Sequence, residues 1–246
     1  FIIPGAILIA VSAVWLFVLW DYSAGSTTGS SSPDPRTARS AGAGLRGIFD
    51  FLLRTKLWVI GLLALLNGSL KEGLTLWGPS FFAKYQSLPL EEVLRLMSFV
   101  PLMNLTALMC SGLINRLFKY RIKYTIAFFI ILTVAFSLLL KAGMGKDYFI
   151  VDAAFFGLLA FLLAVNNMIA SFMPLYFRNE HRVSMVAGFL DCSVYLGAAI
   201  SGPLTGFLAD RSGWQGIIDG WLWVCVAAMV ISFLSSDYQL KTRTNA

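Results

Sequence analysis

One stretch decides the fold: Asn67-Gly-Ser-Leu-Lys71-Glu72-Gly-Leu-Thr75-Leu-Trp77-Gly-Pro79 places an ammonium and a carboxylate inside an apolar run from about Leu57 to Phe82. A helical run of that length can cross the hydrocarbon core of a membrane, which is about 30 Å thick. Lys71 would then lie roughly 21 Å along the helix, well inside the bilayer. A charge there costs at least about 2.5 kcal/mol, so it usually faces a bundle interior or an aqueous cavity. We therefore look for function at Lys71.

The composition of the whole chain predicts an all-α bundle of transmembrane helices. Of its 246 residues 58% are hydrophobic and 13% are charged, with a mean hydropathy of +0.75, whereas soluble domains carry about 25% charged residues. The three cysteines are far apart in apolar runs, which predicts small core residues and neither a disulfide framework nor a zinc site. The net charge of +6 indicates basic loops on one membrane face and no nucleic-acid partner.

The apolar runs divide the chain into seven predicted spans. These are residues 1–20, 57–82, 91–114, 124–140, 149–177, 184–208 and 217–235. Pro101 is expected to kink the third span, and residues 209–215 are expected to form the last turn. Residues 21–56 form a predicted linker rich in Ser, Thr, Gly and Pro, with a short interfacial helix at its end. We thus expect a first helix, a linker, a six-helix unit over 57–236 and a polar tail over 237–246.

Basic residues predict the orientation of these spans. Thirteen Lys and Arg residues fall in the polar segments after the first, third, fifth and seventh spans, against four on the opposite side, namely Lys84, Lys141, Lys146 and Arg211. Because cytoplasmic loops carry the excess of Lys and Arg, the linker and the tail are expected to be cytoplasmic.

Three motifs carry a resemblance to a known family. They are Ser111-Gly-Leu-Ile-Asn115-Arg116-Leu-Phe-Lys119, Val186-Ala-Gly188-Phe-Leu-Asp-Cys-Ser-Val-Tyr195-Leu-Gly197, and Leu70-Lys71-Glu72-Gly73 through Trp77 and Pro79. With one span, a linker and six spans, the chain resembles the carboxyl-terminal half of a major facilitator superfamily transporter, cut inside its sixth helix. The first motif is similar to a degraded copy of that superfamily's Gly-x-x-x-Asp-Arg/Lys loop motif, with Ser111 for Gly and Asn115 for Asp. The other two are similar to helices of the organophosphate:phosphate antiporters, in which an Arg at the position of Lys71 binds the phosphoryl group.

That resemblance implies a carrier without enzymatic chemistry and without a cofactor. Its expected partners are a small anionic substrate, phosphate as the exchanged ion, the lipid bilayer and an amino-terminal half that would complete the substrate site. Residues 1–246 alone would then not transport. Lys71 keeps the charge of the family's Arg but loses its bidentate fork.

Candidate site residues follow from helical spacing and from the resemblance. Asn67, Lys71 and Thr75 recur every four residues and predict a polar, substrate-binding face that includes Gly78. Lys71 would bind an anion or, alternatively, pair with Glu72 or Asp191 as a structural ion pair.

The remaining candidates lie in later spans. Asp191 and Tyr195 share a helix face, where Asp191 would couple an ion, balance Lys71 or sit as a structural acid near a helix amino terminus. Asn166 and Asn167 would bind substrate hydroxyls or bond between helices.

The sequence therefore favours a secondary carrier that exchanges a phosphorylated or other anionic metabolite for phosphate by alternating access. A proton-coupled carboxylate or sugar symporter that uses Glu72 or Asp191 is the alternative within transport. A membrane sensor on a carrier scaffold is the alternative from another class. An enzyme is least favoured, because neither metal-ligand spacing nor a nucleophile motif is present in the sequence.

Overall fold

The computed structural model describes residues 45–235, and this part is helical without a strand, as predicted. The chain divides into two units, residues 1–51 and 52–246. The predicted first span, most of the linker and the tail over 237–246 lie outside the described residues. Helix α3 (Leu45–Arg54) corresponds in sequence to the expected short helix at the end of the linker.

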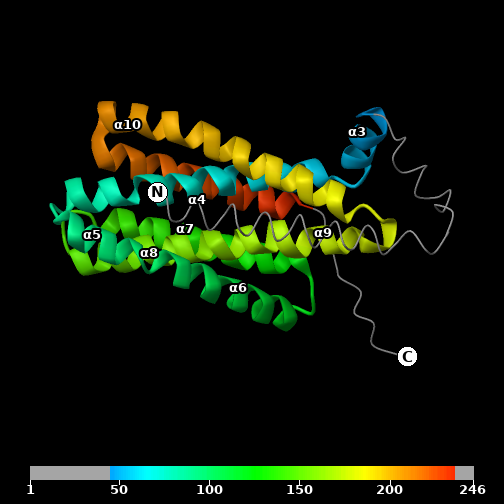
Figure 1. Ribbon diagram of the computed structural model, residues 1–246, viewed down its shortest axis with the longest axis horizontal. Helices are drawn as coiled ribbons and strands as arrows, with labels where there is room; N and C mark the ends of the chain where they lie inside the picture. The colour runs from blue at the N-terminus through cyan, green and yellow to red at the C-terminus, as the bar shows by residue number, and fades with distance from the viewer. Residues whose placement is uncertain (1–44, 236–246) are drawn as a thin grey trace, which may run out of the picture. The chain divides into compact units, whose positions relative to one another are not determined.

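The second unit is a bundle of long antiparallel helices (Figure 1). Its elements are α4 (Leu57–Tyr85), α5 (Leu90–Met97), α6 (Val100–Leu117), α7 (Ile122–Gly143), α8 (Tyr148–Asn167), a π-helix (Met168–Phe172), α9 (Met173–Tyr176), a 3-10 turn (Phe177–Glu180) and α10 (Val183–Leu234). Five of the described helical segments, with α5–α6 and α8–α9 each taken as one, are long and apolar enough to cross a membrane. The chain is thus an integral membrane protein that spans the bilayer several times.

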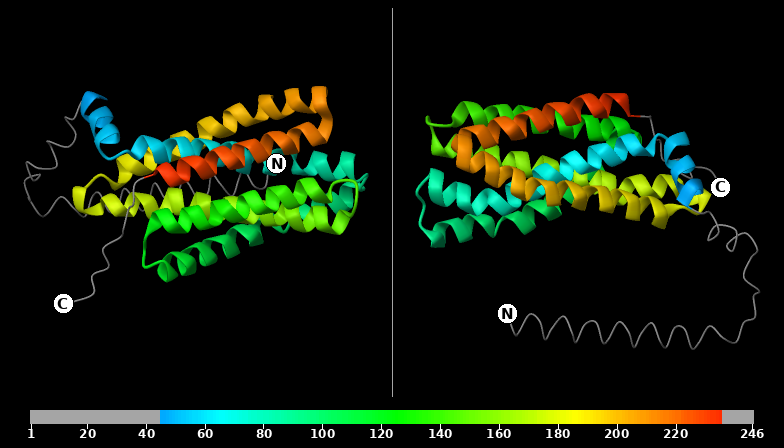
Figure 2. Two further views of the ribbon diagram at one scale, coloured as in Figure 1. Left: turned by 180° about the vertical axis from the view of Figure 1, so that it is seen from behind. Right: turned by 90° about the horizontal axis from the view of Figure 1, so that it is seen from above.

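The last segment reverses direction at a single residue. Helix α10 runs for 52 residues, but Gly213 has φ 61° and ψ −162°, and Figure 2 shows two antiparallel limbs on either side of this point. The predicted turn over 209–215 was too long, because glycine reaches this backbone conformation at little cost while the residues around it stay helical. The limbs 183–212 and 214–234 correspond to the last two predicted spans.

The third predicted span is divided, and its break is not at Pro101. Helix α5 ends at Met97, where the Ser98 hydroxyl donates to the Arg95 carbonyl at 2.6 Å and the Ser98 N–H donates to the Leu94 carbonyl at 3.0 Å. Pro101 lies in the first turn of α6, where a missing N–H breaks no helical hydrogen bond. The proline therefore starts a helix instead of kinking one.

The core of the bundle is the crossing of α4 and α10, the most extensive contact between helices. A Cβ at Gly68 would overlap the carbonyl of Val194, and a Cβ at Gly197 would overlap the carbonyl of Leu65. The two glycines thus let the backbones touch directly. A Cβ at Gly188 would have no neighbour within 4 Å, so this glycine takes no part in the contact.

Helix α6 is the least buried of the spans. Its large exposed apolar side chains are Leu102, Leu105, Leu108, Met109, Leu113 and Leu117, which suits a helix in contact with lipid. Of the three cysteines only Cys225 is buried, while Cys110 and Cys192 are exposed. The expectation that all three are core residues was wrong, because an apolar helix face toward lipid has the same composition as one toward the core.

Candidate functional site

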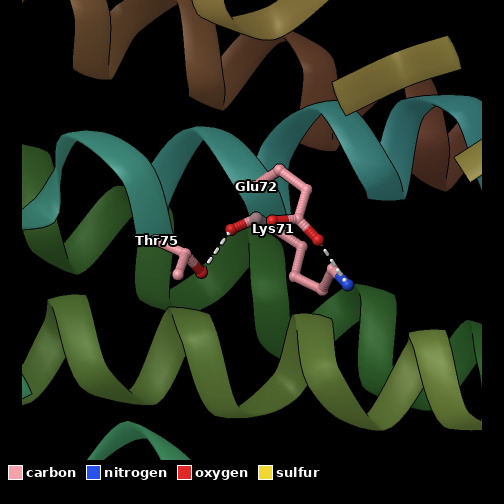
Figure 3. A network of polar contacts seen from close by, with 3 residues as sticks. All are labelled: Lys71, Glu72 and Thr75. Carbon is pink, nitrogen blue, oxygen red and sulfur yellow. Dashed lines mark hydrogen bonds and ion pairs between the residues drawn. The ribbon is translucent and has the colours of Figure 1, made fainter. Parts of the chain in front are cut away.

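Lys71, in the middle of α4, lies in a small polar cluster. Its ammonium pairs with the Glu72 carboxylate at 2.7 Å, and the two side chains are 16% and 36% exposed. The Thr75 hydroxyl donates to the Lys71 carbonyl at 2.8 Å. Figure 3 shows the Lys71 and Thr75 side chains leaving α4 on the same side, with the Glu72 carboxylate turned toward the ammonium. The structure thus brings together three of the predicted site residues.

The Lys71–Glu72 pair joins two consecutive residues of one helix. Consecutive residues point about 100° apart on a helix and do not ordinarily face each other, so both long side chains must bend around α4 to meet. Of the two partners that the sequence left open for Lys71, the structure has Glu72. Glu72 is the more exposed member of the pair.

The predicted polar face of α4 is divided. Asn67 is 2% exposed, and it lines a small internal cavity of about 10 Å³ with residues of α7, α8 and the second limb of α10, among them Thr133 and Cys225. Gly78 is also buried, against Phe155 and Met97, whereas Thr75 is exposed. Helical spacing predicted one continuous polar face. In the structure neighbouring helices bury Asn67 and Gly78 at its two ends, and only Lys71 and Thr75 between them remain accessible.

Asn166 and Asn167 close α8 directly before the π-helix. Asn166 Oδ1 and Asn167 Nδ2 are buried and without a hydrogen-bond partner among the described residues. The interhelical bonds that the sequence offered as their alternative role are therefore not made by these two atoms. A π-helix inside an α-helical span is rare and often occurs at functional sites. The sequence contained no signal for it.

Asp191 and Tyr195 lie apart from this cluster on the first limb of α10. Both are exposed, Tyr195 by 69%. Within the described residues Lys71 forms its ion pair with Glu72 and not with Asp191. The structure thus has Glu72 and not Asp191 as the partner of Lys71, while the roles of Asp191 in ion coupling or as a structural acid stay predictions.

A second polar cluster, which the sequence did not predict, joins the carboxyl-terminal end of α4 to the α7–α8 loop and to α8. Gln86 Nε2 donates to the Asp152 carboxylate at 2.6 Å, and the Tyr85 hydroxyl accepts from the Gly145 N–H at 2.6 Å. An acid inside the apolar run 149–177 was the signal that could have found Asp152. Its place only four residues after the start of α8 makes a structural role the simpler one.

The degraded loop motif also has a structural explanation. Asn115, at the position where the motif has an acid, is fully buried. Its side-chain oxygen accepts from the Thr125 hydroxyl at 3.1 Å and its carbonyl accepts from the Tyr120 N–H at 2.8 Å. This residue therefore ties the end of α6 to the start of α7.

No protein-family model matches the chain, and no curated protein matches its sequence. The site is therefore interpreted from its own geometry. Over residues 45–235 no three His, Cys, Asp or Glu side chains gather as a metal site would require. The Lys71 cluster consists of an ammonium paired with a carboxylate of the same helix and a hydroxyl one turn away. Such a cation inside a membrane span can bind an anion or form a structural ion pair.

Proposed function

We propose that the chain is the carboxyl-terminal half of a secondary transporter that binds a small anionic, phosphorylated metabolite at Lys71 and moves it by alternating access in exchange for phosphate. The observation that carries the proposal is the ammonium of Lys71 in the middle of a membrane-spanning helix, 16% exposed and paired with its own neighbour Glu72. A charge in such a place is costly, and substrate binding is one of the few roles that offset the cost.

Glu72 then acts as an internal counter-ion. In the substrate-free site its carboxylate neutralises Lys71, and an arriving phosphoryl group takes its place on the ammonium. Exposure of 36% gives the Glu72 side chain room to turn away, whereas Lys71 remains between the helices. The exchange for phosphate in this proposal rests on the resemblance to the organophosphate:phosphate antiporters, since the Lys71–Glu72 pair leaves the empty site without an uncompensated charge.

Hydrogen-bonding groups on α4 and α8 would orient the rest of the substrate. Thr75 lies one turn from Lys71 on the same side of α4. In α8, Asn166 offers a buried acceptor and Asn167 a buried donor, both without partners among the described residues. An amide donor suits a phosphate oxygen, and an amide acceptor suits a sugar hydroxyl. The proposal thus includes a phosphorylated compound with hydroxyl groups as substrate class.

The experiment compares phosphate exchange by the full-length natural protein in liposomes for Lys71→Gln, Glu72→Gln and the double variant. If Lys71 binds the substrate, Lys71→Gln abolishes exchange and the double variant stays inactive, although the second substitution removes the uncompensated carboxylate and restores stability in detergent. Recovery of exchange in the double variant would show that Lys71 is only a structural counter-ion. Lys84→Gln, on the same helix but exposed near its end, is the matched control and keeps exchange.

A further inference from the structure

A second cavity lies at the end of the bundle where α4 ends. It has a volume of about 360 Å³, which is within the range of small-molecule sites, roughly 300–1,000 Å³. Its lining residues come from the end of α4, the α7–α8 loop and the start of α8, and they are Tyr85, Gly143, Gly145, Lys146, Asp147, Tyr148 and Val151. None of the residues of the Lys71 cluster lines it.

This cavity lies at the boundary between membrane and water. Three spanning segments have their ends there, since one ends at Tyr85, another ends at Gly143 and a third begins at Tyr148. Tyr148 is 60% exposed, and tyrosine is enriched at the depth of lipid headgroups. A cavity in this position lies at the depth of the lipid headgroups, so a headgroup can enter it.

The polar groups of the cavity have opposite charges on adjacent residues. Among the described residues the Lys146 ammonium has no carboxylate partner, whereas Lys141 nearby is paired with Asp219 at 2.7 Å. One oxygen of Asp147 accepts from the Phe149 N–H at 2.9 Å, which fixes this carboxylate at the start of α8. A ligand with an anionic and a cationic group would therefore find a partner for each.

Tyr85 adds a third polar group. Its hydroxyl oxygen accepts the Gly145 N–H at 2.6 Å, so the hydroxyl proton is left to donate to a ligand. Together with Lys146 it offers a hydrogen-bond donor and a cation to a phosphate, while Asp147 offers a carboxylate to an ammonium.

We propose that this cavity binds the headgroup of a zwitterionic phospholipid with a primary ammonium, phosphatidylethanolamine. The phosphate contacts Lys146 and the Tyr85 hydroxyl, and the ammonium contacts Asp147. Because the cavity is at the helix ends, the acyl chains of the lipid extend along the bundle. The site is separate from the proposed substrate site and does not depend on the transport function.

The test titrates phosphatidylethanolamine and phosphatidylglycerol into the delipidated full-length protein and measures bound lipid by native mass spectrometry. Phosphatidylethanolamine should bind more tightly, and Lys146→Gln should weaken it about fivefold, the effect of one lysine at a membrane surface. Asp147→Asn should weaken phosphatidylethanolamine but not phosphatidylglycerol. Asparagine caps a helix as well as aspartate does, so this variant removes the charge and keeps the fold of α8.

Lys84→Gln is the control, because Lys84 is exposed in the last turn of α4 and does not line the cavity. It should leave phosphatidylethanolamine binding unchanged. Equal binding of the two lipids, or equal loss in all three variants, would overturn the proposal in favour of unspecific attraction. Soluble glycerophosphoethanolamine that competes as well as the lipid would overturn the assignment to a lipid.

Discussion

Gly197→Ala tests whether the α4–α10 crossing organises the bundle. In a helix alanine is more stable than glycine by about 1 kcal/mol, so the substitution would stabilise an isolated α10. In the structure the added methyl group would overlap the Leu65 carbonyl and lie 2.9 Å from the Ser69 nitrogen. Both are backbone atoms, so no side chain can turn away and the two helices must separate.

Overpacking of this kind costs about 1–3 kcal/mol, and a clash with backbone belongs in the upper part of that range. After the helix propensity of alanine is subtracted, Gly197→Ala should be destabilised by about 1–2 kcal/mol. Gly188→Ala is the matched control on the same limb, because nothing lies within 4 Å of its Cβ position. It should be stabilised by up to about 1 kcal/mol.

The assay is reversible unfolding in mixed micelles, followed by tryptophan fluorescence, for the wild-type protein and both variants. The two variants should differ by about 1–3 kcal/mol, with Gly197→Ala the less stable of the two. If Gly197→Ala is as stable as Gly188→Ala, the close approach of α4 and α10 is not present in the folded protein.

Two further predictions concern the α6–α7 connection and the membrane orientation. Asn115→Leu should lower the free energy of unfolding by about 0.5–1.5 kcal/mol, because the buried Thr125 hydroxyl loses its closer acceptor and keeps only the Arg121 carbonyl at 3.4 Å. Asn104→Leu on the exposed side of α6 should change it by less than about 0.5 kcal/mol. Single cysteines at Ser31 and Thr244, in a background without the natural cysteines, should both resist an impermeant thiol reagent in whole cells, since the excess of basic residues predicts a cytoplasmic linker and tail. Labelling at either position would contradict the predicted cytoplasmic location of that segment.

The spans could be predicted from the sequence because the length and polarity of apolar runs determine where a chain can cross a bilayer. The breaks could not be predicted as well. The reversal at Gly213 uses one residue, and its neighbours have helical sequences. The sequence alone does not tell whether Pro101 lies inside a helix, which it would kink, or in the first turn of a helix.

At the candidate site, Lys71 could be found because a charge inside an apolar run is costly and so carries information. The sequence could not tell which acid pairs with Lys71, because Glu72 and Asp191 both offer a carboxylate. Glu72 reaches the ammonium only because both side chains bend around the helix. The orientation of Asn67 depends on which helices surround α4, and spacing along one helix does not contain that information. The π-helix after Asn167 depends on backbone hydrogen bonds for which no residue pattern is diagnostic.

The central claim is that Lys71 binds an anionic substrate, and exchange of radiolabelled phosphate across liposomes by the full-length protein tests it most directly. Lys71→Arg retains a cation that can hold phosphate, so it should keep measurable exchange, while Lys71→Gln should lose it, both alone and together with Glu72→Gln, which restores stability. An excess of a sugar phosphate should compete with phosphate in the wild type and in Lys71→Arg. Exchange by Lys71→Gln at the wild-type rate would contradict the claim.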